Sequence, residues 1–161
     1  SYILNRQKAA NYYDKFLGKS DFFSIPFRTL DSNHVFHQYT LKLNDEINRE
    51  ELIKYLSQKN IPAMIYYPVP AHKQKMFSKI PKSLNDMKNT NWLSERVISL
   101  PMHTELSTDQ QDFIVQNIFN FVKFKTNGWN STNYWRHLAF LKIYCVFEIN
   151  YGSSYYSSNN K

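Results

Sequence analysis

The stretch from Asn33 to Gln74 constrains the fold most, because two extended segments bracket one helix within it. Residues 35–43 alternate with the two-residue period of a strand. One face of that strand would carry Val35, His37, Tyr39, Leu41 and Leu43, and the other Phe36, Gln38, Thr40 and Lys42. Asn48, with Glu51 three residues later, is a helix N-cap signal. We expect this helix to bury Leu52, Ile53 and Leu56, to end at Asn60, and to be followed after Pro62 by a strand over 63–67.

Three further helices and one further strand are predicted outside this stretch. The first helix, over residues 1–17, has apolar positions at helical spacing, and Gly18 follows it as a C′ glycine. Residues 24–29 are expected to be an extended linker, and a helix capped by Ser83 to end near Ser94. Residues 97–100 predict a strand, and a capping box of Ser107 and Gln110 opens the last helix. Along one side of that helix we expect Phe113, Ile114, Asn117, Ile118 and Phe121.

The order of these elements predicts an α+β fold, in which helices pack on a small three-stranded sheet. The predicted domain covers residues 1–122, which hold 15 basic and 12 acidic residues. Residues 123–161 form an Asn/Ser/Tyr-rich tail with five basic residues and one acidic residue, and we expect it to be disordered or an aberrant C-terminus.

Composition also limits where and how this chain works. The first residues, from Ser1 on, lack the pattern of a signal peptide, so we expect none, and the longest apolar run is far shorter than a membrane span. Cys145 is the single cysteine, so a disulfide framework is excluded and a reducing, cytoplasmic location is expected. The three glycines form no phosphate-binding loop, and no His/Cys/carboxylate group has zinc spacing, so we expect no metal site.

The candidate binding residues are imidazoles, amides and tyrosines of residues 33–74, namely His37, Gln38, Tyr66, Tyr67, His72 and Gln74. An amide both donates and accepts hydrogen bonds, as sugar hydroxyls require, and a tyrosine ring offers a flat apolar face with a polar tip. The alternative for each is ordinary: an edge-of-core histidine, a solvated glutamine, strand-end packing of tyrosines, or polar loop residues that do nothing.

Four segments in register resemble the C-terminal part of the DegT/StrS family of nucleotide-sugar aminotransferases. They are NRQKAANYYDKFL (5–17), NHVFHQYTLKL (33–43), NIPAMIYYPVPAHKQ (60–74) and VISLPMHTELSTDQQDFI (97–114). The resemblance covers about residues 1–122. It implies that they form the small C-terminal domain of the fold found in aminotransferases that depend on pyridoxal phosphate (PLP). The large domain, which in this family carries the PLP lysine, would be missing from this chain, so the resemblance implies a fragment that is inactive alone.

The resemblance also implies a reaction and its participants. The family transfers an amino group from an amino acid, with glutamate as the expected donor, to a keto group of a UDP- or dTDP-linked sugar for surface polysaccharides. A homodimer is implied for the full-length protein. The small domain would supply the sugar-side wall, with no catalytic and no cofactor-binding residue of its own.

Individual residues carry the resemblance to different degrees. Tyr67 and Pro68 match the family's His-Tyr-Pro segment, whereas Tyr66 replaces its histidine, and a neutral phenol cannot face a sugar carboxylate as an imidazolium would. His37 and Gln38 match the strand motif, and His72 and Gln74 match a His-x-Gln pattern. Two readings of another class remain open: a basic nucleic-acid-binding module, suggested by a pI near 9.4, and a non-catalytic interaction domain.

Overall fold

The computed structural model describes residues 1–77, 79 and 87–125, and residues 1–125 form one compact unit. The predicted cap at Ser83 and all of the predicted tail beyond residue 125 lie outside the described residues. In chain order the elements are α1 (Tyr2–Leu17), β1 (Phe23–Ser24), β2 (Tyr39–Leu43), α2 (Arg49–Gln58), the 3-10 turns η1 (Ala71–Lys73) and η2 (Lys75–Phe77), α3 (Lys88–Arg96), β3 (Val97–Leu100) and α4 (Thr108–Lys125). The predicted α+β class is confirmed.

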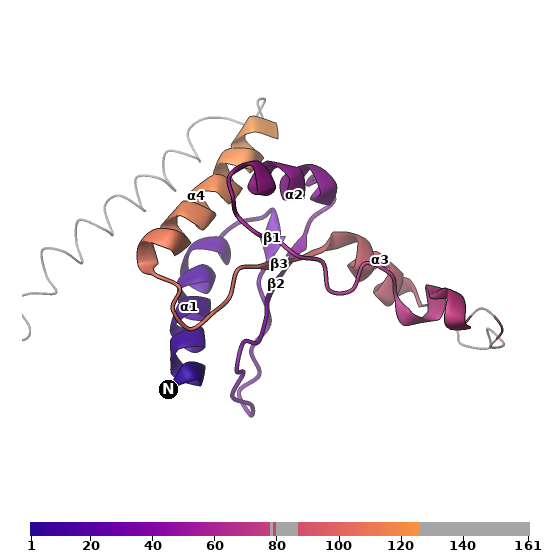
Figure 1. Ribbon diagram of the computed structural model, residues 1–161, viewed down its shortest axis with the longest axis horizontal. Coiled ribbons are helices and arrows are strands. Elements are labelled where there is room, and N and C mark those ends of the chain that lie inside the picture. Colours follow the sequence, from indigo (N-terminus) through magenta and orange to yellow (C-terminus); the bar gives the residue numbers. More distant parts are fainter. Residues whose placement is uncertain (78, 80–86, 126–161) are drawn as a thin grey trace, which may run out of the picture. The chain divides into compact units, whose positions relative to one another are not determined.

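The sheet has three antiparallel strands in the order β1-β2-β3. Phe23 pairs with Leu43 at one edge, and Tyr39 pairs with Leu100 on the other side of β2. Helices α1 and α4 lie on one side of these strands and α3 on the opposite side (Figure 1). The sheet therefore has one face toward a helical core and another toward α3.

One predicted strand is wrong, and the third strand of the sheet is β1, which lies at the opposite edge. Residues 63–67 form a single bridge, in which Met64 exchanges backbone hydrogen bonds of 3.0 and 2.7 Å with Ser99. Prolines at 62, 68 and 70 remove amide donors on both sides of this bridge, so the ladder cannot be extended. Residues 23–24, which pair with β2 instead, form a strand too short to give a periodic signal.

The first half of the predicted strand at 35–43 is also wrong, because β2 begins only at Tyr39. Phe36 has φ 49°, in the left-handed region, and this interrupts the predicted alternation of buried and exposed side chains. Its ring is 1% exposed and stacks on His34 with the ring centroids 4.1 Å apart, whereas Val35 remains 45% exposed. From Tyr39 onward the predicted alternation holds, with Tyr39, Leu41 and Leu43 buried.

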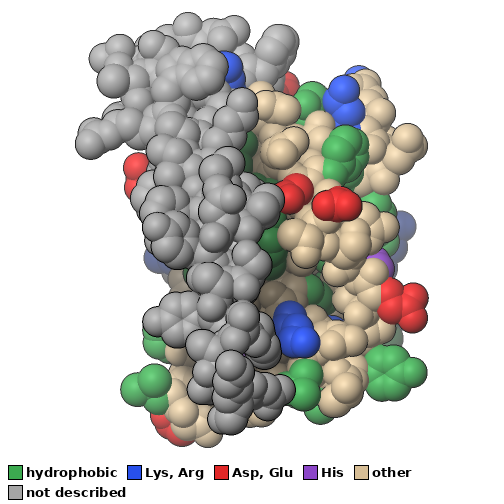
Figure 2. Space-filling view, turned by 90° about the vertical axis from the view of Figure 1, so that its left-hand side faces the viewer, with side chains coloured by type: hydrophobic (Ala, Val, Ile, Leu, Met, Phe, Trp, Pro, Cys, Tyr) green, Lys and Arg blue, Asp and Glu red, His purple; other side chains and the backbone are tan. Residues whose placement is uncertain are grey.

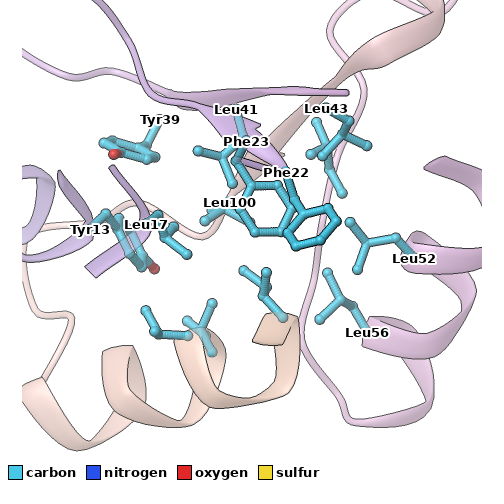
Figure 3. Packing of buried hydrophobic residues seen from close by; sticks show 14 of the residues in the cluster. Tyr13, Leu17, Phe22, Phe23, Tyr39, Leu41, Leu43, Leu52, Leu56 and Leu100 are labelled. Carbon is cyan, nitrogen blue, oxygen red and sulfur yellow. The ribbon is translucent and has the colours of Figure 1, made fainter. Parts of the chain in front are cut away.

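The core lies between the buried face of β2 and the helices (Figure 3). Tyr39, Leu41 and Leu43 point toward apolar side chains of α1, α2 and α4 that include Tyr13, Leu17, Leu52, Leu56, Ile114 and Ile118. The rings of Tyr13 and Tyr39 lie 4.9 Å apart. Each large side chain buried in this way contributes about 1.5–3 kcal/mol relative to exposure, so this face of β2 anchors the fold.

The helix ends follow local chemistry at most positions. Asn48 Oδ1 accepts from the Glu51 amide at 3.0 Å, as predicted. At the other end of α2, Asn60 has φ 58° and its amide bonds the Ser57 carbonyl, while the Ile61 amide bonds that of Leu56. This is the hydrogen-bond pattern of a Schellman motif. The predicted end of the helix at Asn60 is thus two residues past the last helical residue, Gln58.

Two predictions at helix positions need correction. Gly18 ends α1 with φ −67°, so it does not act as a left-handed C′ glycine. A Cβ at Gly18 would lie 2.7 Å from the Asp14 carbonyl oxygen, so close approach explains the glycine. In α4 the Ser107–Gln110 capping box is confirmed, but Phe113 is 49% exposed. The buried side of α4 is instead made by Gln111, Ile114, Val115, Asn117, Ile118, Phe121 and Val122.

Candidate functional site

The face of the sheet opposite the core forms the floor of a pocket. Thr40 projects from β2 on this face, and its Oγ1 lies 2.8 Å from the Ser99 Oγ on β3. The same residue, Ser99, holds Met64 through the two backbone hydrogen bonds of the bridge. Tyr66 follows Met64 by two residues, so this bridge anchors the chain just before the two tyrosines.

The pocket has a volume of about 570 Å³ and lies between residues 66–74 and helix α3. Its lining residues are Thr40, Tyr66, Tyr67, Val69, Pro70, Ala71, Gln74, Thr90, Leu93, Ser94 and Val97. A volume of this size is within the range of small-molecule sites, roughly 300–1,000 Å³.

One wall of the pocket is an irregular segment that carries two tyrosines. The rings of Tyr66 and Tyr67 meet edge to face with their centroids 6.4 Å apart, and they are 43% and 76% exposed. Behind them η1 follows Pro70, and Gln74 Nε2 reaches toward the Val69 carbonyl at 3.5 Å. Both tyrosines therefore line the pocket while a large part of each side chain remains exposed to solvent.

The other wall is α3, which has no buried residue and is attached by polar and cation–π contacts. Arg49 at the start of α2 donates to the Ser94 carbonyl, and Arg96 pairs with Asp45 at 2.6 Å. The Trp92 ring lies beneath two cations, with Lys42 Nζ at 5.4 Å and the Arg96 guanidinium at 5.1 Å from its centroid.

Three of the six predicted binding residues, Tyr66, Tyr67 and Gln74, line this pocket. His72 lies behind the lining, and its Nε2 is 3.0 Å from Asn91 Oδ1 on α3. His37, which is exposed, and Gln38, which is half-buried, belong to the segment before β2 and do not line the pocket. A substrate-binding role stays a prediction for all six.

Sequence reasoning missed the contribution of α3, which brings Thr90, Leu93 and Ser94 to the pocket. It also assigned no role to Thr40, although its place on the outer face of the strand was predicted. The α3 residues gave no comparable signal, because their position depends on contacts with segments far away in the chain.

The lining is apolar and uncharged, with hydrogen-bonding groups from two tyrosines, two threonines, a serine and a glutamine. These groups suit a neutral polyhydroxylated ring, which presents hydroxyls to amides and apolar C–H faces to aromatic rings. The described part of the chain contains no group of three or more His, Cys, Asp or Glu that could hold a metal ion. Nor does it contain a helix long and apolar enough to cross a membrane.

These lining residues do not fit PLP. That cofactor needs a lysine for its aldehyde and fixed groups at its pyridine nitrogen and phosphate. No lysine, arginine or carboxylate lines the pocket among the described residues. The arrangement can therefore bind and orient a neutral ligand, but it does not supply the cofactor chemistry of an aminotransferase.

Comparison with known proteins defines the class of this chain. A profile of the DegT/DnrJ/EryC1/StrS aminotransferase family matches residues 1–119. The chain belongs to this family, which confirms the resemblance seen in its four segments. Family members depend on PLP, so the cofactor of the class is established even though the described pocket does not fit it.

Particular relatives include enzymes that act on nucleotide sugars. A UDP-N-acetyl-3-dehydro-alpha-D-glucosamine 3-aminotransferase of Acidithiobacillus ferrooxidans is 36% identical over 110 residues, 68% of this chain and 28% of that protein. A pleiotropic regulatory protein of Geobacillus stearothermophilus is 32% identical over 120 residues, 73% of this chain and 32% of that protein. The chain thus spans about a third of the length of these relatives.

A solved structure shares the fold. The crystal structure of a DegT/DnrJ/EryC1/StrS aminotransferase from Brucella abortus matches with a TM-score of 0.67 and 28% identity. The match covers 74% of this chain and 31% of the Brucella chain. The three-stranded sheet with its four helices is therefore an arrangement found within an aminotransferase of this family.

Proposed function

We propose that residues 1–122 are the C-terminal small domain of a nucleotide-sugar aminotransferase, and that the pocket beside Tyr66 and Tyr67 holds the sugar. The enzyme would transfer an amino group from an amino acid, with glutamate as the expected donor, to a keto group of a UDP- or dTDP-linked sugar. The observation that carries this proposal is the uncharged pocket of about 570 Å³ between residues 66–74 and α3.

The chemistry of the lining supports a sugar ring more than a nucleotide diphosphate. Thr40, Ser94 and Gln74 offer donors and acceptors to hydroxyls, while Tyr66 and Tyr67 offer ring faces. A diphosphate would require cations or a cluster of backbone amides. The lining also lacks a cation for a sugar carboxylate, so an uncharged sugar is favoured over a uronate.

The remaining parts of the reaction belong to the rest of the enzyme. Because the pocket does not fit PLP, we place the PLP lysine and the phosphate-binding groups in a large domain outside these 161 residues. This chain would then hold and orient the sugar but would be inactive by itself. A homodimer is the proposed state of the full-length enzyme, and the predicted boundary at residues 122/123 stays a prediction.

The charge distribution favours this function over nucleic-acid binding. On the face seen in Figure 2, basic and acidic side chains are interspersed rather than gathered into a basic stripe. Phosphate-binding proteins concentrate Lys and Arg on one surface. The near balance of 15 basic and 12 acidic residues within residues 1–122 likewise supports the small-domain proposal over a nucleic-acid-binding module.

Tyr67→Ala in the complete enzyme tests the proposal. Removing a ring that positions the sugar should lower kcat/KM for the nucleotide sugar about 10- to 100-fold, which corresponds to about 1–3 kcal/mol. The half-reaction with glutamate should stay within about three-fold of wild type, because the proposal places Tyr67 on the sugar side of the site, away from the contacts of the amino acid donor. Each half-reaction is measured separately by single-turnover kinetics.

Tyr2→Ala is the matched control, since Tyr2 is a similarly exposed tyrosine on α1 outside the pocket. It should leave both half-reactions unchanged. An equal loss in both half-reactions of the Tyr67→Ala enzyme would contradict the sugar-side assignment and favour simple packing of the tyrosine.

A further inference from the structure

Helix α3 forms one wall of the pocket without being anchored in the core. None of its nine residues is buried, although Thr90, Leu93 and Ser94 line the pocket. Helices in proteins are normally held by an apolar face packed against other elements, and segments with few buried contacts open most easily. The position of this wall must therefore depend on the polar contacts of α3.

These contacts hold the two halves of α3 differently. The C-terminal half is tied to α2 and to the turn before it, through Arg49 to the Ser94 carbonyl and through Arg96 to Asp45. Toward the middle of the helix, the Asn91 side chain meets His72 of η1 at 3.0 Å. This last bond connects α3 to the segment that forms the opposite wall.

His72 and Asn91 are both half-buried and neither lines the pocket, so their bond acts from behind the two walls. His72 follows Ala71 directly and precedes Gln74 by two residues, and Asn91 directly follows Thr90. Ala71, Gln74 and Thr90 all line the pocket. A hydrogen bond between His72 and Asn91 thus constrains the distance between residues that do line the pocket.

We propose that the His72–Asn91 hydrogen bond is a latch that sets the width of the pocket. His72 and Asn91 are positioning residues in this assignment, and they decide which sugar substituents fit between Gln74 and α3. The assignment of sugars as the ligand rests on the proposed function, whereas the latch itself rests on the geometry of α3. It gives His72 a role different from direct substrate contact.

Hydrogen exchange of the full 161-residue chain tests the latch without any ligand. Asn91→Ala and His72→Ala should each accelerate exchange of the α3 amides about five-fold, the effect of losing one ordinary hydrogen bond. Exchange in α4 should not change. The double variant should exchange no faster than either single variant, because both remove the same bond.

Two further variants separate the latch from a general loss of structure. His72→Gln keeps a side-chain donor that can reach Asn91 Oδ1, so it should restore slow exchange. Asn89→Ala changes an exposed neighbour on the same helix and should have no effect. Unchanged α3 exchange in Asn91→Ala and His72→Ala would overturn the latch.

Steady-state kinetics of the complete enzyme test the link to specificity, with UDP-N-acetyl-3-dehydroglucosamine as the probe. The Asn91→Ala enzyme should show a KM for this sugar raised about five-fold, with the half-reaction with glutamate unchanged. Faster α3 exchange with an unchanged KM would overturn the width-setting role. A wild-type enzyme that aminates no nucleotide sugar would overturn the proposed function and this specificity role together, while the exchange data would still decide the latch.

Discussion

At the scale of single residues, a polar cluster at the edge of the core joins α1 to the segment before β2. The Tyr39 hydroxyl donates to Asp14 Oδ1 at 2.7 Å, and Arg28 pairs with the other carboxylate oxygen. The Arg28 guanidinium also lies 4.5 Å from the centroid of the Phe36 ring. Charges so close to a core are tolerated when they are paired, and here the paired guanidinium lies over the buried Phe36 ring.

Two buried tyrosines, Tyr13 and Tyr39, make the stability of the folded protein sensitive to high pH. Burial raises the pKa of both Tyr13 and Tyr39 above the ordinary value of 10.0, and for Tyr39 the hydrogen bond to Asp14 and the charge of that carboxylate raise the pKa further. Above about pH 10 the unfolded chain loses these protons and the folded chain keeps them. Their contribution to stability is therefore complete below about pH 10 and is lost as the pH rises.

We expect the free energy of unfolding to fall above about pH 10, by up to about 1.4 kcal/mol per pH unit for each buried tyrosine. Tyr39→Phe should flatten this decline, whereas Tyr2→Phe, at an exposed position, should not. Urea unfolding between about pH 8 and pH 11 measures the slopes. A Tyr39→Phe protein with the wild-type slope would show that Tyr39 is not protected from ionisation in the folded state.

At the scale of elements, α2 is specified at both ends by its own residues. Asn48 caps its first turn. Asn60 follows its end in a left-handed backbone conformation, which asparagine adopts more readily than most other residues. Leu52 and Leu56 then bury one side of the helix against the core. Helix α3 has neither an N-terminal side-chain cap bond nor a buried residue, so its position depends on its neighbours.

Replacing Asn48 by alanine should destabilise the protein by about 1 kcal/mol, because an amide of the first turn of α2 loses its acceptor. Lys54→Ala, at an exposed position on the same helix, is the control and should stay within about 0.5 kcal/mol of wild type. Chemical denaturation compares the two. Equal stability of both variants would mean that water replaces the Asn48 cap without loss.

At the scale of the whole molecule, the first and last described helices close the core together. Gln111 of α4 is buried and donates to the Ala9 carbonyl of α1 at 2.8 Å, and Tyr12 donates to Asp112. The last turns of α4 add Phe121 and Val122 to the core, and the helix continues three residues past the predicted boundary, to Lys125. The compact unit of residues 1–125 therefore includes the whole of α4.

Removing residues 126–161 should lower the melting temperature by less than about 4 °C, the shift that about 1 kcal/mol produces in a domain of this size. Removing residues 117–161 should have a far larger effect, because Ile118, Phe121 and Val122 leave the core. Thermal melts of the two shortened proteins make the comparison. A large shift for the first truncation would mean that residues 126–161 stabilise the domain.

The amino-acid sequence by itself determined the local features of this protein: the helices, their caps at Asn48 and Ser107, the buried face at Tyr39, Leu41 and Leu43, and the family. Periodicity and capping depend on residues within a few positions of each other, so they can be predicted from the sequence alone. Local information of the same kind indicates Tyr66 and Tyr67, from their residue type and their place before Pro68, and Gln74, from the irregular segment that follows Pro70.

Only the tertiary structure decided which segments form the sheet and what encloses the pocket. The pairing of β2 with residues 23–24 and the single bridge from Met64 to Ser99 both depend on partners far apart in the chain. Phe36 takes a left-handed conformation and packs against Arg28, which interrupts an alternation that otherwise predicts a strand. The wall formed by α3, and the bond between His72 and Asn91 that holds it, likewise join residues with no common sequence signal. Long-range packing competes with local preference at such positions, and there it prevailed.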